Sequence, residues 1–217
     1  MKLNSNIFIF LFCCISSSLK AQDQYKWELK KESDGIFVYT ADVKGSEYKV
    51  FKAITTISSS GMHEIAASIL DASNCKLIYP DTRECYQIKK YSDGNFLQYQ
   101  LSDIQWPAED RDGVYEIKSQ YQKDGNELTV FINCIQYDLP KRKHVVRMTE
   151  GSGFWKIRET RKGYYEVIYQ YHANPAGSIP IWLVNIFLET NPLKTMQNLK
   201  SSITRGDFKN VKLDFIN

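Results

Sequence analysis

The sequence predicts an α+β domain in which a curved antiparallel sheet wraps around a long C-terminal helix. Two patterns carry this prediction. Short segments of alternating apolar and polar residues, typical of strands, follow one another through most of the chain. Residues 180–205 instead place apolar residues every three or four positions, as an amphipathic helix does. The chain has 217 residues, of which 43% are hydrophobic, and this favours one globular domain.

The expected strands are joined by short turns. Gly, Asp and Asn gather at 92–95 and 123–126, and Gly163 closes a third turn, which is hairpin chemistry. Consecutive strands with such turns predict an antiparallel meander. The segments with strand alternation are 35–41, 48–57, 85–91, 96–101, 114–122, 128–137, 145–150, 154–160 and 164–172.

Two helices are expected. Residues 62–70 place Ile65, Ala66, Ile69 and Leu70 on one helical face, and Ser60 is available as the N-cap. The long C-terminal helix carries its apolar stripe through residues 183–203. Pro192 lies inside this helix and is expected to kink or interrupt it, because proline has no amide hydrogen to donate. A sheet of this many strands must bend, and the long helix is the element that can cover its concave face.

The N-terminus has the layout of a secretory signal peptide. Residues 7–15 form a continuous apolar run, and Leu19-Lys20-Ala21 resembles a cleavage site. The run is too short to span a bilayer, which needs about 20 apolar residues. Two alternatives stay open, namely a buried N-terminal strand and lipoprotein processing at Cys13 or Cys14.

We therefore divide the chain into a signal peptide over residues 1–21, a ligand-binding domain over 22–205 and a polar C-terminal tail over 206–217. The mature protein is expected to be exported, periplasmic or secreted, after a cut near Ala21.

Three cysteines remain after such a cut. An oxidising compartment permits one disulfide, and Cys75 with Cys85 is the first choice because it closes a short loop. The alternative is that Cys75, Cys85 and Cys134 are all small buried apolar residues. No spacing of Cys and His suggests a metal site, and we expect no cofactor.

Aromatic residues are unusually frequent, with 14 Tyr and 11 Phe. In the last strand Tyr165, Val167, Tyr169 and Tyr171 share one face, which is apolar with polar tips. Such a face can line a pocket that holds an apolar ligand and anchors one polar group. The alternative is an ordinary packed core.

Four stretches, in order along the chain, give a resemblance to the START family of lipid-transfer domains. Trp106-Pro107 followed by Arg111-Asp112 resembles the proline-containing loop of the family, although Gly113 stands where an aromatic or bulky residue is common. The stretch from Asn174 to Asn185 resembles the entry to the final helix. The two weaker matches are the opening, Trp27 to Tyr39, and the second strand, Tyr48 to Ala53.

The resemblance implies a helix-grip fold with an internal hydrophobic tunnel and the C-terminal helix as its lid. It implies binding or transfer of a lipid, sterol or other hydrophobic small molecule without chemistry. We expect the mouth of the tunnel to be formed by Trp106, Arg111 and Asp112, and we take Trp182 as a core residue. The side chains expected to line the tunnel are Tyr99, Phe131, Tyr165, Val167, Tyr169, Tyr171, Leu183, Ile186 and Phe187.

The same residues leave other functional hypotheses open. An enzyme of the related cyclase or hydrolase type, acting on a hydrophobic ligand in the same cavity, is the alternative. Glu166 and His172 could act as acid or base only if their strand face turned inward. A scaffold protein with a filled core is a third hypothesis. The formal charge of +3 gives no support for nucleic-acid binding. The basic run 141–144 is a solvated loop or a contact to anionic lipid headgroups, and only the second reading gives the protein transient membrane contact. We expect a monomer.

Overall fold

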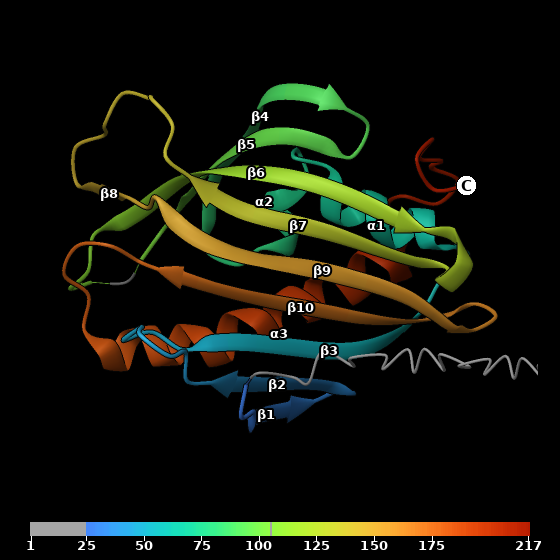
Figure 1. The fold of residues 1–217 in the computed structure, drawn as a ribbon, viewed down its shortest axis with the longest axis horizontal. Coiled ribbons are helices and arrows are strands. Elements are labelled where there is room, and N and C mark those ends of the chain that lie inside the picture. The colour runs from blue at the N-terminus through green and yellow to red at the C-terminus, as the bar shows by residue number, and fades with distance from the viewer. Residues whose placement is uncertain (1–24, 105) are drawn as a thin grey trace, which may run out of the picture.

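A computed structural model describes residues 25–104 and 106–217, and it contains a ten-stranded, strongly curved sheet (Figure 1). The hydrogen-bonded order is β1-β2-β3-β10-β9-β7-β6-β5-β4, so β1 and β4 are edges and the sheet is not a closed barrel. Every pair in this path is antiparallel, and β8 alone pairs in parallel with the start of β6. The strands are β1 (Glu28–Ser33), β2 (Ile36–Ala41), β3 (Val50–Ser58), β4 (Thr82–Ser92), β5 (Asn95–Ser102), β6 (Asp110–Gln122), β7 (Glu127–Ile135), β8 (Val145–Arg147), β9 (Glu150–Arg161) and β10 (Tyr164–Asn174).

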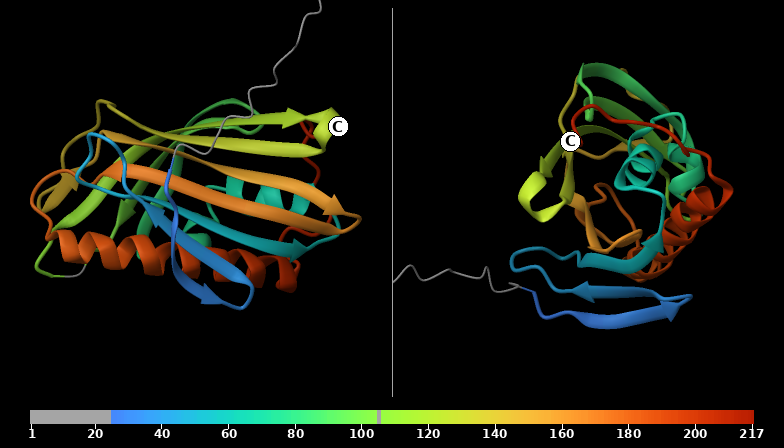
Figure 2. Two further views of the ribbon diagram at one scale, coloured as in Figure 1. Left: turned by 60° about the horizontal axis from the view of Figure 1, so that its bottom comes forward. Right: turned by 90° about the vertical axis from the view of Figure 1, so that its right-hand side faces the viewer.

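The helices are α1 (Met62–Leu70), α2 (Cys75–Ile78) and α3 (Ile181–Arg205), with a short 3-10 turn at Lys123–Gly125. Helix α3 runs along the length of the sheet, while α1 and α2 fill its concave side near one end (Figure 2). The predicted fold class, a curved antiparallel sheet wrapped around a long C-terminal helix, is therefore confirmed.

Each segment with strand alternation is found in the sheet, but three local predictions differ from the structure. β1 was missed because its charged sequence has no alternation, which is common for an exposed edge strand. The segment 145–150 is split between β8 and the start of β9. The two glycines of Gly151-Ser152-Gly153 predict a bulge or turn, but this stretch lies in regular pairing inside β9.

Details of α1 and α3 also differ from expectation. The N-cap position of α1 is Gly61, and Ser60 instead donates its hydroxyl to the Glu64 carboxylate at 2.8 Å. α3 is not interrupted at Pro192 and continues to Arg205, where Gly206 ends it with a φ of 73°. Packing on both sides of Pro192 outweighs the one amide hydrogen bond that the proline removes.

One end of the sheet is packed solid. The second half of α3 contributes Met196, Leu199 and Ile203 to a core cluster that also contains Ile65 of α1 and Trp155 of β9. These side chains are almost completely buried. The space between these elements is therefore filled by their own side chains.

The last residues belong to the same core. Residues 206–217 were expected to form a polar tail, but Ile216 is buried, and Leu213 and Phe215 pack against the core cluster. The amide of Leu213 also donates to Nδ1 of His63 at 3.1 Å. The apolar residues of this segment are spaced too irregularly to predict its docking from the sequence.

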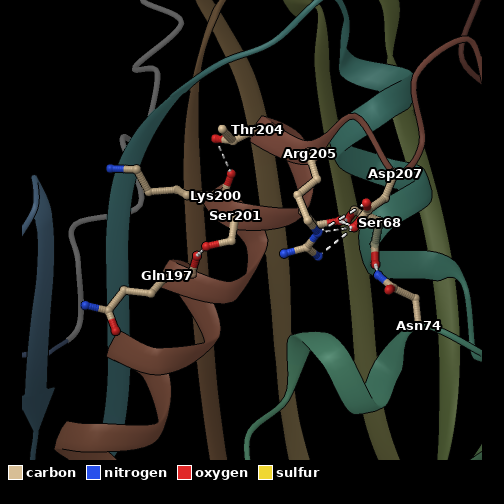
Figure 3. Close-up of polar contacts among 9 residues, drawn as sticks. Ser68, Asn74, Gln197, Lys200, Ser201, Thr204, Arg205 and Asp207 are labelled. Carbon is tan, nitrogen blue, oxygen red and sulfur yellow. Dashed lines mark hydrogen bonds and ion pairs between the residues drawn. The ribbon is translucent and has the colours of Figure 1, made fainter.

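A buried polar link fixes the C-terminal half of α3 against α1. The hydroxyls of Ser68 and Ser202 are 2.8 Å apart, and Ser202 donates to Asp207, which also pairs with Arg205 (Figure 3). Asn74 donates to the carbonyl of Ser68 at 2.9 Å. This network holds the closed end of the molecule in one arrangement.

The expected signal peptide, with Cys13 and Cys14, lies outside the described residues. Within residues 25–104 and 106–217, no helix combines the length and apolarity needed to cross a bilayer.

Candidate functional site

The opposite end of the molecule is hollow. A cavity of about 250 Å³, called here the main cavity, lies between the first half of α3 and the concave face of the sheet. Its wall is mostly apolar and aromatic. The lining includes Phe51, Tyr79, Tyr115, Met148, Tyr169, Tyr171, Ile179, Val184, Phe187, Leu188 and Pro192, with the polar residues Asp81, Gln100, Ser102, Arg111, Asn191 and Thr195.

A second, smaller space continues from it against the sheet. This sheet chamber has a volume of about 90 Å³ and shares Tyr79, Gln100, Tyr115, Tyr169 and Tyr171 with the main cavity. Its remaining lining residues are Gln98, Ile117 and Ile132.

Helix α3 offers one regular stripe to the main cavity. Val184, Phe187, Leu188, Asn191, Pro192 and Thr195 recur at the three- and four-residue spacing of one helical face. Of the three helix residues predicted to line the tunnel, the structure places only Phe187 on this wall. Leu183 is buried elsewhere, and Ile186 is 46% exposed. The sequence predicted an apolar stripe on this helix but not which side of the helix faces the cavity. The predicted lining is therefore displaced by one residue.

On β10 the predicted face points inward, but only part of it borders the cavity. Tyr169 and Tyr171 line both spaces, as the alternation of β10 predicted. Tyr165 and Val167 share their face but lie at the closed end, inside the core cluster. Position along the strand, rather than its face, separates these two residues from the cavity.

Two further predictions fail because their strand faces are opposite to those expected. Tyr99 belongs to a small second core on the outer side of the sheet, with Leu97, Leu101 and Val114. Phe131 is 39% exposed on the outer face of β7. Gln98 and Gln100 of β5 face inward instead. Alternation alone would turn these glutamines outward, so no sequence signal could have found them.

Arg111 is buried at the mouth of the main cavity, as its place in the proline-containing loop predicted. Its guanidinium donates to backbone carbonyls of Glu109, Pro175, Ala176 and Ser178. The last three lie in the connection between β10 and α3. Arg111 therefore holds the start of the helix against the sheet. Burial lowers the pKa of Arg111 from its ordinary value, as expected for a cation that only carbonyl dipoles solvate.

The other expected mouth residues do not line the cavity. Asp112 faces the outer core, where its carboxylate accepts from Arg147 at 2.6 and 2.8 Å and from the Tyr99 hydroxyl at 2.9 Å. Adjacent residues of a strand point to opposite faces, so Arg111 and Asp112 cannot both face inward. Trp106 is 90% exposed beside the mouth and covers no part of it.

The inward-facing tyrosines are strongly desolvated. Burial raises the pKa of Tyr79 to about 12, and it raises the pKa values of Tyr169 and Tyr171 well above their usual value. Burial also raises the pKa of Tyr115. These hydroxyls stay protonated at physiological pH, so they are neutral hydrogen-bond donors.

Two glycines of β9 create the floor on which Tyr171 lies. A Cβ at Gly151 would come within 2.4 Å of the Tyr171 hydroxyl oxygen, and one at Gly153 within 2.6 Å of its ring. The absent side chains therefore position this tyrosine in the cavity wall.

Acid–base residues are scarce around these spaces. Glu166 pairs with Arg158, and His172 contacts Ser46 and Tyr48, all on the face of β10 away from the cavity. Apart from tyrosines, the ionisable residues of the lining are Asp81 and Arg111. Within the described part of the chain, no cluster of three or more His, Cys, Asp or Glu could hold a metal ion.

The predicted disulfide between Cys75 and Cys85 is present and joins α2 to β4. The segment 79–81, which lines the main cavity, lies between the two bridged cysteines. Cys134 is a buried free thiol, and burial raises its pKa to about 11.

The chain matches the START domain and proteins that carry it. The model of the START domain matches residues 14–203. An uncharacterized protein of Pseudomonas aeruginosa is 32% identical over 178 residues, which are 81% of this chain and 86% of the relative. The phosphatidylcholine transfer protein of Rattus norvegicus is 27% identical over 73% of this chain and 75% of its own.

Solved structures with a similar fold include a lipid transfer protein. A STAR-related lipid transfer protein from Xanthomonas axonopodis superposes with a TM-score of 0.73 at 30% identity, covering 82% of this chain and 98% of that chain. The Zhui aromatase/cyclase from Streptomyces sp. R1128 has a TM-score of 0.52 at 9% identity over 75% of this chain and 98% of its own, a likeness of fold alone. With a family model that spans most of its length and a sheet that grips its C-terminal helix, this chain belongs to the START domain family.

Proposed function

We propose that this protein binds one lipid or similar hydrophobic molecule in the main cavity and carries it between membranes without changing it chemically. The observation that carries the proposal is the mostly apolar cavity between α3 and the sheet of a START domain. Burial of apolar ligand surface, about 25 cal/mol per Å², is the driving force. The sparse acid–base groups of the lining favour a carrier over the alternative of an enzyme.

A membrane surface is the proposed partner for loading and release. Trp182 is 56% exposed rather than buried in the core as expected, and Ile181 and Ile186 beside it are also exposed. These residues lie on the turns of α3 that supply Val184 and Phe187 to the cavity wall. Exposed Trp106 belongs to the loop that supplies Ile104 to the same wall. Tryptophan favours the bilayer interface, because its ring is apolar while its N–H is polar.

Export of a monomer remains part of the proposal. The leader-like residues 1–21 and the Cys75–Cys85 disulfide both support an oxidising compartment outside the cytoplasm.

Neighbouring residues on α3 give a matched test. Phe187→Asp places a charge in the cavity wall, whereas Ile186→Asp places it on the exposed side of the same turn. We expect Phe187→Asp to lower lipid occupancy at least about tenfold, since burying an unpaired carboxylate is costly. Ile186→Asp should keep its occupancy and slow lipid transfer between vesicles.

The measurements are native mass spectrometry with organic extraction, and transfer of fluorescent lipid from donor to acceptor vesicles. Circular dichroism checks that both variants fold. A wild-type protein that carries no lipid and takes up none would overturn the proposal. A ligand recovered with an altered mass would instead favour the cyclase or hydrolase alternative.

A further inference from the structure

The sheet chamber is polar although it lies deep against the sheet. Its polar lining consists of Tyr79, Tyr115, Tyr169, Tyr171, Gln98 and Gln100. The main cavity, by contrast, is walled mostly by apolar side chains from α3 and the loops. A ligand that fills both spaces would therefore place its polar end against the sheet and its apolar part under the helix.

Two polar side chains of this chamber have no hydrogen-bond partner among the described residues. The hydroxyl of Tyr171 is buried and has no hydrogen-bond partner among the described residues. The side-chain amide of Gln98, a residue only 7% exposed, makes no hydrogen bond within the described chain either. Burying a polar group without a partner is unfavourable, so such groups point to a ligand or water that satisfies them.

The remaining groups define what the chamber offers. Gln100 uses its amide nitrogen on Thr82 at 2.9 Å, which leaves its carbonyl oxygen as an acceptor. Tyr79 already accepts from Trp155 at 3.1 Å and keeps its own hydroxyl hydrogen to donate. The chamber therefore presents several donors and at least one acceptor.

No formal charge lines this chamber. Its residues are tyrosine, glutamine and isoleucine, and Arg111, which lines only the main cavity, already uses its guanidinium on four backbone carbonyls. A carboxylate or phosphate placed here would lose its hydration without gaining a counter-charge.

We infer that the sheet chamber binds the uncharged hydroxyl or carbonyl end of a hydrophobic ligand, with Tyr171 and Gln98 as its hydrogen-bond partners. The preferred ligand is thus a neutral lipid rather than a phospholipid or a fatty acid. This inference rests on the proposed carrier function and names its ligand class.

Three ligands with one common chain test the inference. Oleyl alcohol, oleate and oleoyl lysophosphatidylcholine differ at the polar end, and each can be titrated calorimetrically from cyclodextrin into the mature protein. We expect oleyl alcohol to bind at least about tenfold more tightly than the other two, because only its end avoids burial of a charge.

Tyr171→Phe removes the hydroxyl that would bind the ligand and keeps the ring that packs in the wall. It should weaken binding of oleyl alcohol about fivefold, through loss of one hydrogen bond, while the unliganded protein becomes no less stable to urea. Gln98→Leu should weaken binding by a similar factor. Tyr165→Phe is the matched control, since this tyrosine lies on the same strand face outside the cavity, and it should leave the affinity unchanged.

Each outcome is decisive. Oleate or lysophosphatidylcholine binding as tightly as the alcohol would overturn the inference and leave the carrier function standing. The same holds if Tyr171→Phe binds all three ligands like the wild type. If none of the three ligands, and no phospholipid, binds the wild-type protein, both the carrier function and this inference fall.

Discussion

At the scale of single residues, glycines shape the cavity because they have no side chain. Gly151 and Gly153 leave space for Tyr171, and Gly113 does the same for Tyr115, whose hydroxyl oxygen would be 3.0 Å from a Cβ at that position. The glycines of this chain therefore decide where the tyrosines lie, and so which groups a ligand meets.

Gly151→Ala tests this role. Its Cβ would lie 2.4 Å from the Tyr171 hydroxyl oxygen, so the ring must move. We expect a loss of about 1–3 kcal/mol in the free energy of unfolding, together with weaker lipid binding. Urea unfolding and ligand titration measure the two effects.

Gly125→Ala is the control for that substitution. Its Cβ would meet nothing closer than 3.9 Å, and its stability should stay within about 0.5 kcal/mol of the wild type. A Gly151→Ala protein as stable and as active as this control would contradict the packing argument.

Among the elements, α3 has two distinct halves. The second half is held by core side chains and by the Ser68–Ser202 contact, whereas the first half faces the cavity and is tied to the sheet by Arg111. Motion that admits a ligand is therefore expected at the N-terminal half, because fewer packed contacts resist it there.

The element α2 has its own constraint, the disulfide to β4. Cys75 and Cys85 are separated by 10 residues in sequence, and closing a loop of this size stabilises a fold by about 3 kcal/mol. Reduction should lower the free energy of unfolding by about 2–3 kcal/mol and speed hydrogen exchange in residues 79–81.

Unfolding by urea with and without reductant measures that loss. Cys134→Ala, which removes the free thiol, should show the same difference between oxidised and reduced protein. Equal unfolding midpoints in the two conditions would mean that the bridge does not constrain α2.

At the scale of the whole molecule, the buried tyrosines predict sensitivity to alkali. The pKa of Tyr79 rises to about 12 on folding, and burial also raises the pKa values of Tyr115, Tyr169 and Tyr171. Groups with a raised pKa in the folded state contribute stability that is complete below the unfolded pKa, about 10, and is lost as pH rises toward the folded pKa.

We therefore expect the free energy of unfolding to fall steeply between about pH 10 and 12, by up to about 1.4 kcal/mol per pH unit for each buried tyrosine. Cys134, whose pKa rises to about 11, adds to the fall. Urea unfolding at stepped pH measures the slope. Tyr171→Phe should reduce it and replacement of the exposed Tyr91 by Phe should not; equal slopes in both variants would contradict the assignment.

The sequence by itself predicted the strands between residues 35 and 172, the short helix 62–70, the long C-terminal helix and the family, and it made Cys75–Cys85 the first choice for a disulfide. Alternation, helical periodicity and turn residues are local signals, and they survive folding because neighbouring residues fix them. The same signals put Tyr169, Tyr171 and Phe187 on inward-facing surfaces, and these three do line the cavity.

Only the tertiary structure decided which part of each inward surface borders empty space. Tyr165 and Tyr169 share a strand face and both belong to the core cluster, yet only Tyr169 also lines the cavity. Gln98 and Gln100 turn inward because the apolar face of β5 is covered by a second core on the outer side, a long-range contact that strand alternation cannot report. A cavity is defined by residues distant in sequence, so its boundaries follow from packing and not from local pattern.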